Sequence, residues 1–204
     1  MFRFLLHIVF VIVLMAPQAL AERPYAPPPI GTQITWTDDS GGDSTTRVSE
    51  VVASGPDFAI YLYDLRWEDT RSSSYFAEFS GVHIASCASP MPTIEERNTL
   101  GNLWPLQTGK ELTIGSLQPV TYRVEAPHQH DVSLSDDSGS SYQVTSLSGD
   151  RQIDLIVSLA LNTAVQLAWT DGSKIEVIDV FRKPGADDPS LVEKLGSCRD
   201  LLDR

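Results

Sequence analysis

The sequence predicts a mainly β fold, either an antiparallel sandwich or a strongly curved half-barrel, with two short helices. From Gly31 onward, short runs rich in Val, Ile, Thr, Tyr and Trp are separated by Asp, Ser and Gly, which is typical of strands joined by tight turns. Two other segments carry the residues that start helices. The chain has 204 residues, enough for one domain with a sizeable core. We therefore expect a single β-rich domain over 31–204.

Residues 1–21 follow the order of a secretory signal peptide. Arg3 precedes an apolar stretch over 4–15, and small residues follow with Ala19 and Ala21 in an A-x-A cleavage pattern. A membrane anchor is the alternative, but a spanning helix needs about 20 apolar residues and this stretch is shorter. We expect cleavage near Ala21, a periplasmic or secreted mature protein, and no stable membrane insertion after cleavage.

The negative net charge of the chain argues against two classes of partner. Lys and Arg number 15 against 27 Asp and Glu, a formal net charge of -12. Repulsion from phosphate argues against a nucleic-acid partner and against docking on anionic lipid by charge alone. Solubility is the simplest role for this acidity.

The elements are expected in the following order. Residues 22–30 are rich in proline, which fixes φ and removes backbone donors, so they should form an extended lead-in outside the sheet. The apolar run over 153–161 favours a central strand over a helix because it is short and β-branched. Strands are predicted at 32–38, 46–53, 58–67, 74–86, 110–116, 120–126, 130–135, 142–147, 152–159, 164–170 and 174–182.

Two helices should interrupt the strands. Thr93 and Glu96 form a capping-box pattern, and Gly101 marks the end of that helix. Asp188 followed by Pro189 starts the second, whose apolar residues recur at helical spacing and place Cys198 on the buried stripe.

The two cysteines, Cys87 and Cys198, predict one disulfide in an oxidising compartment. Two free buried thiols are the alternative. The bond would tie the C-terminal helix to the middle of the domain.

Three predicted hairpin turns share an Asp-rich sequence, and two of them suggest a catalytic site. The Asp-Ser-Gly segments at Asp39 and Asp137 resemble aspartic proteases, in which two carboxylates share a proton and activate water. Here Asp38 and Asp136 precede them where that family has apolar strand residues. A solvated turn is therefore favoured over an active site. The third turn, Asp171-Gly172, is the strongest short hairpin signal in the chain.

Other side chains suggest binding. His128 and His130 share a strand face, but the third ligand of a metal site would have to come from elsewhere, so exposed histidines are favoured and no cofactor or metal is expected. Alternation in the strand over 58–67 puts Tyr61, Tyr63 and Trp67 on one face, which either packs in the core or faces a ligand.

The stretch Leu103-Trp104-Pro105-Leu106-Gln107-Thr108-Gly109-Lys110, followed by two strands and a later hairpin, resembles uncharacterised periplasmic β-proteins of Gram-negative bacteria. Some of these are half-barrels that wrap a helix, and the resemblance implies no known reaction.

The sequence therefore favours an exported, non-enzymatic envelope protein that binds an apolar or extended ligand, or a protein partner, on its sheet. A hydrolase, most specifically an acid protease using Asp39 and Asp137, is one alternative. A purely structural domain is the other.

Overall fold

The computed structural model describes residues 24–39, 44–67, 70–128, 140–182 and 193–203; of 64–67 and 70–73 it describes the backbone alone. Within these residues the chain forms eleven strands, one α-helix and one short 3₁₀ helix. The strands are β1 (Thr32–Asp38), β2 (Thr45–Gly55), β3 (Phe58–Trp67), β4 (Thr70–Phe79), β5 (His83–Ser86), β6 (Glu111–Ile114), β7 (Val120–His128), β8 (Ser141–Ser148), β9 (Arg151–Ser158), β10 (Thr163–Trp169) and β11 (Lys174–Arg182); the helices are α1 (Ile94–Gly101) and η2 (Gly196–Leu201).

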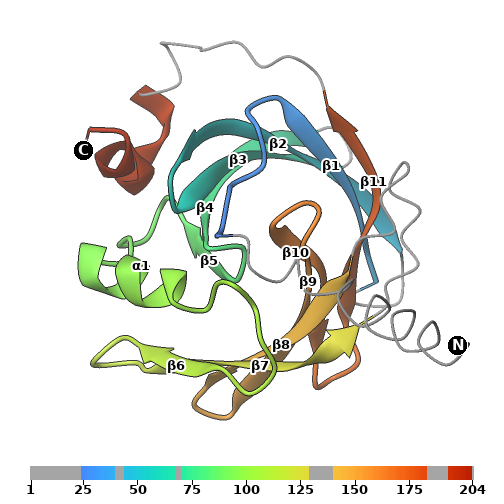
Figure 1. Cartoon of the computed structure of the whole chain (residues 1–204). Coiled ribbons are helices and arrows are strands. Elements are labelled where there is room, and N and C mark those ends of the chain that lie inside the picture. Colours follow the sequence, from blue (N-terminus) through green and yellow to red (C-terminus); the bar gives the residue numbers. More distant parts are fainter. Residues whose placement is uncertain (1–23, 40–43, 68–69, 129–139, 183–192, 204) are drawn as a thin grey trace, which may run out of the picture.

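All the strands belong to one open antiparallel sheet with the order β5-β4-β3-β2-β1-β11-β10-β9-β8-β7-β6. Four strands separate β4 from β10 in this order, yet Glu78 of β4 hydrogen-bonds Thr163 and Ala164 of β10. The sheet is therefore strongly curled, as Figure 1 shows. The predicted fold class, in its half-barrel version, is confirmed.

The curl produces two cores, one on each face of β3 and β4. Ala59 and Tyr61 point into the curl, toward β10, and belong to the smaller apolar cluster. Phe58 and Ile60 point the other way and join the larger cluster, which the helices and the inner face of β6–β9 complete. Because both faces of β3 are buried here, residues of either parity along this strand are core residues.

Helices α1 and η2 lie on the same side of the molecule, near the C-terminus in Figure 1. The predicted capping box of α1 is present: Thr93 accepts from the backbone N–H of Glu96, and the Glu96 carboxylate accepts from the backbone N–H of Thr93. The Cys87–Cys198 disulfide joins η2 to the segment that follows β5, as predicted. The backbone N–H of Ser197 also donates to the Cys87 carbonyl at 2.8 Å.

The predicted strand over 74–86 is wrong, because the chain folds back within it. Ser80 and Gly81 adopt positive φ angles of 50° and 70° and form the turn between β4 and β5. Gly81 also lies against the β9–β10 turn, so that an added Cβ would come 2.7 Å from the Asn162 carbonyl oxygen.

The C-terminal helix also differs from the prediction. In the part of this segment that the structure describes, the chain forms the 3₁₀ helix η2 and no continuous α-helix. Gly196, with φ 52°, is the first residue of η2. The buried stripe is nevertheless present: Leu195, Cys198 and Leu201 are buried, and Leu202 is partly buried. The predicted start at Asp188 and the predicted strand over 130–135 lie outside the described residues.

The loop after α1 fills the space between the helix and β6–β9. Leu103, Trp104 and Leu106 are buried, and the Trp104 indole donates to the Ser80 carbonyl at 2.7 Å. Tyr25, in the proline-rich segment before β1, packs on Trp104 with ring centroids 5.6 Å apart. The first half of the Leu103–Lys110 stretch is thus part of the larger core, whereas residues 107–109 are exposed.

Candidate functional site

One recess is a groove between α1 and η2, with a volume of about 550 Å³. That volume falls within the range of about 300–1,000 Å³ typical of ligand sites. We call it the α1–η2 groove. Its lining residues are Pro90, Met91, Pro92, Thr93, Ile94, Glu95, Arg97, Ser197, Asp200 and Leu201.

The groove's position is fixed by two attachments. On one side the disulfide holds η2, and Cys198 Sγ lies 3.7 Å from Met91 Sδ. On the other side Arg97 of α1 binds Asp57 in the β2–β3 turn through two contacts, Nε to Oδ2 at 2.6 Å and Nη2 to Oδ1 at 2.8 Å. Both walls are therefore tied to the sheet.

Arg97 also lies over aromatic rings. Its guanidinium carbon is 5.6 Å from the Phe58 ring centroid and 5.8 Å from that of Phe79, within the range of a cation–π contact. Nη1 is buried and has no hydrogen-bond partner in the described structure. The Asp57 carboxylate neutralises this buried cation, so Arg97 supplies little net charge to the groove.

A smaller recess of about 200 Å³ adjoins the groove and shares Pro90, Met91 and Pro92 with it. His83 lines it, with Nδ1 2.6 Å from the Tyr122 hydroxyl. Burial lowers the pKa of His83, which opposes its protonation. Glu96 also lines this recess, and the backbone N–H of Thr93 lowers its pKa, so it stays ionised.

The most unusual titratable group lies in the smaller core, away from both recesses. Glu78 is 3 % exposed, and its carboxyl contacts Tyr61 Oη at 2.9 Å, Thr163 Oγ1 at 2.6 and 2.8 Å, and the Ala164 N–H at 3.2 Å. Burial raises the pKa of Glu78, and burial together with the nearby Glu78 raises that of Tyr61. Because no solvent reaches it, this cluster joins β4 to β10 as an internal contact.

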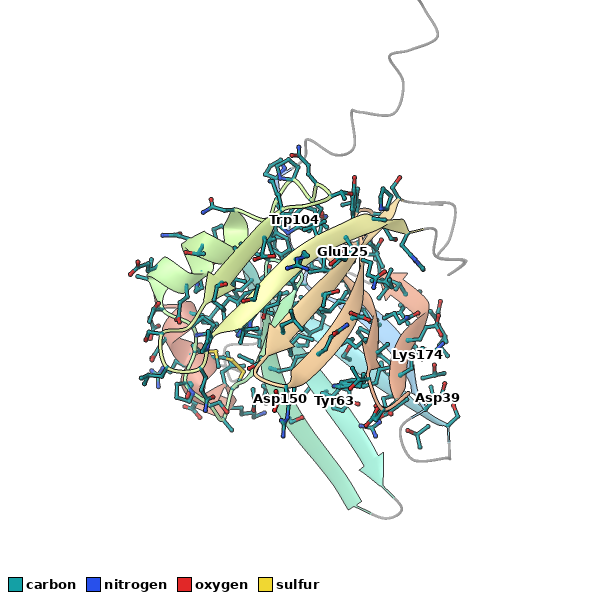
Figure 2. The ribbon with its side chains drawn as sticks, turned by 90° about the horizontal axis from the view of Figure 1, so that it is seen from below. Asp39, Tyr63, Trp104, Glu125, Asp150 and Lys174 are labelled. Atoms are coloured by element: carbon teal, nitrogen blue, oxygen red, sulfur yellow. A yellow bond between two sulfur atoms is a disulfide. The ribbon has the colours of Figure 1, made fainter. Side chains whose placement is uncertain are left out.

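The aromatic residues predicted to face a ligand have different surroundings. Tyr61 is 2 % exposed and stacks on Phe76 at 5.5 Å between ring centroids. Tyr63 is half-buried, and its hydroxyl accepts from Arg47 at 2.8 Å. Figure 2 places Tyr63 at the opposite end of the sheet from Trp104. Trp67 ends β3, and its side chain lies outside the described residues. A ligand at these residues stays a prediction.

The acidic turns have a mixed outcome. Asp39 is exposed, as a turn residue should be, whereas Asp38 is 4 % exposed and binds Arg47 with Oδ2 to Nη2 at 2.8 Å. Asp38 therefore does not have the solvated surroundings expected of a tip residue. Asp137 lies outside the described residues, so the structure does not describe the pair proposed for an acid protease.

The predicted histidine pair is described only at His128, which is exposed at the end of β7; His130 lies outside the described residues. Among the residues that the structure covers, no group of three or more His, Cys, Asp or Glu could hold a metal ion. No helix in the same set is long and apolar enough to span a bilayer.

Sequence reasoning missed both Glu78 and the groove. The groove combines residues about 100 positions apart, and no local pattern signals such a pairing. One signal was available for Glu78. This acidic residue lies between apolar residues along β4, at a position that pairs with Ala59 of β3.

The chain was compared with family models, curated proteins and solved structures. No family model matches the chain, and no curated protein matches significantly. Among solved structures, a chain in the complex of MucA and MucB from Pseudomonas aeruginosa matches with a TM-score of 0.37 and 9% identity. The match covers 84% of this chain and 56% of that chain. A likeness of this size does not extend to function, ligands or partners.

Proposed function

We propose that this protein is an exported, non-enzymatic envelope protein that binds an extended segment of a protein partner in the α1–η2 groove. The observation that carries the proposal is the groove itself, with a volume of about 550 Å³ and a mixed apolar and polar lining. The Cys87–Cys198 disulfide supports an oxidising compartment and so agrees with the N-terminal export signal.

The form of the groove favours a segment over a compact ligand. It is lined by residues of both α1 and η2, and its apolar residues lie among groups that can hydrogen-bond, including Thr93 and Ser197. Extended peptides are bound by such surfaces, where pockets take side chains and nearby polar groups take the backbone.

The test uses a photo-crosslinking amino acid placed at Ser197 in the full chain, in the exporting cell. The matched control carries it at Leu117, which is 95% exposed in the turn between β6 and β7. We expect a protein adduct at Ser197 that is absent at Leu117. The adducted protein, once purified, should bind the wild-type chain, and Ile94→Ser should weaken binding where Leu117→Ser does not.

Identical adducts at both positions, no adduct at Ser197, or equal binding by both Ser variants would overturn the proposal. Ile94 is a suitable position because it is 54% exposed and begins α1, where a serine costs the helix little. The folded state should therefore survive this substitution.

A further inference from the structure

The charges of the α1–η2 groove point to the chemistry of its occupant. We infer that the groove selects a segment in which a Lys or Arg side chain stands next to an apolar one. This inference rests on the proposed function and adds the class of partner. Three features support it. The groove has two carboxylates, the one cation among its lining residues is paired with Asp57, and part of its lining is apolar.

The carboxylates belong to Glu95 and Asp200, one on each helical wall. Both residues are exposed, and neither forms an ion pair in the described structure. Arg97 is the one cation among the lining residues, and Asp57 already neutralises it. The groove therefore carries one carboxylate on each helical wall, and its one lining cation does not offset them.

A basic side chain that enters the groove would meet a carboxylate on either wall. Each contact would be solvent-exposed, where an ion pair contributes about 0.2–1 kcal/mol. An acidic segment would meet repulsion from both walls. Charge complementarity of this kind selects a partner more than it raises total affinity.

The apolar part of the groove supplies the second requirement. Pro90, Met91 and Pro92 form a continuous stretch, with Ile94 from α1 and Leu201 from η2 beside it. Met91 is held against the disulfide, and the prolines have few backbone conformations, so this surface is preformed. An apolar side chain adjacent to the basic one would cover it.

The test measures binding of capped hexapeptide pools, each with one residue fixed at one position, to the purified full chain. The pools with Lys or Arg fixed should bind at least about three-fold more tightly than the Gln pool and more tightly still than the Glu pool. Pools with Leu or Met fixed should also bind more tightly than those with Ser. Raising the salt concentration should reduce the advantage of Lys.

Variants locate the effect in the groove. Glu95→Gln and Asp200→Asn should each reduce the preference for Lys over Gln by roughly two- to three-fold, and Asp200→Lys should abolish or reverse it. Asp150→Asn is the matched control, because Asp150 is an exposed acid in the β8–β9 turn (Figure 2) and should leave the preference unchanged. Circular dichroism and thermal melting check that all four variants fold.

The outcomes separate this inference from the proposed function. Pools that bind in the groove, as shown by loss with Ile94→Ser, but prefer Glu or show no charge preference would overturn the inference and leave the proposed function standing. An equal loss of the Lys preference in Asp150→Asn would overturn it too. Absence of binding by every pool, together with no adduct at Ser197, would overturn both.

Discussion

Replacing Glu78 tests whether the carboxyl that joins β4 to β10 is protonated in the folded protein. Thr163 Oγ1 lies 2.8 Å from Oε1 and 2.6 Å from Oε2, and a hydroxyl has one proton to donate. A neutral carboxyl satisfies both contacts, because one oxygen donates while the other accepts. Burial without a cationic partner raises the pKa of Glu78 and favours the same state.

The pH dependence follows from this raised pKa. Below the ordinary value of about 4.5, Glu78 is protonated in both states and carries no penalty. Above it the unfolded chain ionises while the folded chain keeps its proton, so stability falls as pH rises, by up to about 1.4 kcal/mol per pH unit, until the folded-state pKa is passed. Glu78→Gln keeps a neutral group of the same shape and removes this loss. Its stability relative to wild type should therefore increase with pH.

Glu78→Ala measures how much the Glu78 contacts contribute to the free energy of unfolding. It removes the carboxyl partner of the Tyr61 hydroxyl, the Thr163 hydroxyl and the Ala164 N–H in a buried site, at roughly 1–3 kcal/mol each, although the two hydroxyls also lie 3.4 Å apart. We expect a loss of about 3–6 kcal/mol for Ala and a change within about 1 kcal/mol for Gln at low pH.

The measurement is urea unfolding followed by tryptophan fluorescence between about pH 4 and pH 8, with linear extrapolation to water. Glu193→Gln, at an exposed position, is the control for a general loss of negative charge. A difference between Glu78→Gln and wild type that stays constant across this range would refute the argument that the folded state holds the proton.

Two further predictions concern the chain's covalent and steric constraints. Replacing Cys87 and Cys198 together by Ser should lower the free energy of unfolding by about 4–5 kcal/mol, since the bond closes a loop with a sequence separation of 111; a loss below about 1 kcal/mol in chemical denaturation would contradict the loop-entropy argument. Gly81→Ala should cost about 1–3 kcal/mol more than Gly109→Ala. Both glycines have positive φ, but a Cβ at Gly81 meets a carbonyl oxygen at 2.7 Å while Gly109 has nothing within 4 Å. Equal losses of stability in thermal melts would show that the close approach does not destabilise the Gly81 variant.

Local chemistry made several elements predictable. The Asp171-Gly172 turn joins β10 to β11 as expected, with Gly172 at φ 89° and Asp171 Oδ1 accepting from the Ser173 N–H at 2.9 Å. The capping box at Thr93 and the pairing of Cys87 with Cys198 were predictable for the same reason. In each case the residue types fix the geometry within a few positions or leave one possible partner.

The rest depends on contacts between distant strands. The Ser80-Gly81 turn carries a Ser-Gly turn dipeptide, but the dipeptide lies inside a run of strand-forming residues, and the turn packs against the β9–β10 turn that Gly81 touches. Two buried faces on β3 could not be foreseen, because alternation alone predicts one covered face, and the second is covered only once the sheet curls. The groove likewise requires α1 and η2 to be brought together by the disulfide.

The position of β3 and β4 between the two clusters has a consequence for how the molecule unfolds. One layer of backbone is the common wall of both apolar interiors, so loosening either interior removes support from the other. Heating should therefore give a single calorimetric transition, with no intermediate in which one half persists. The β3–β4 hairpin, which is continuous with this wall, projects from the body of the protein in Figure 2, so its base is anchored in both apolar interiors.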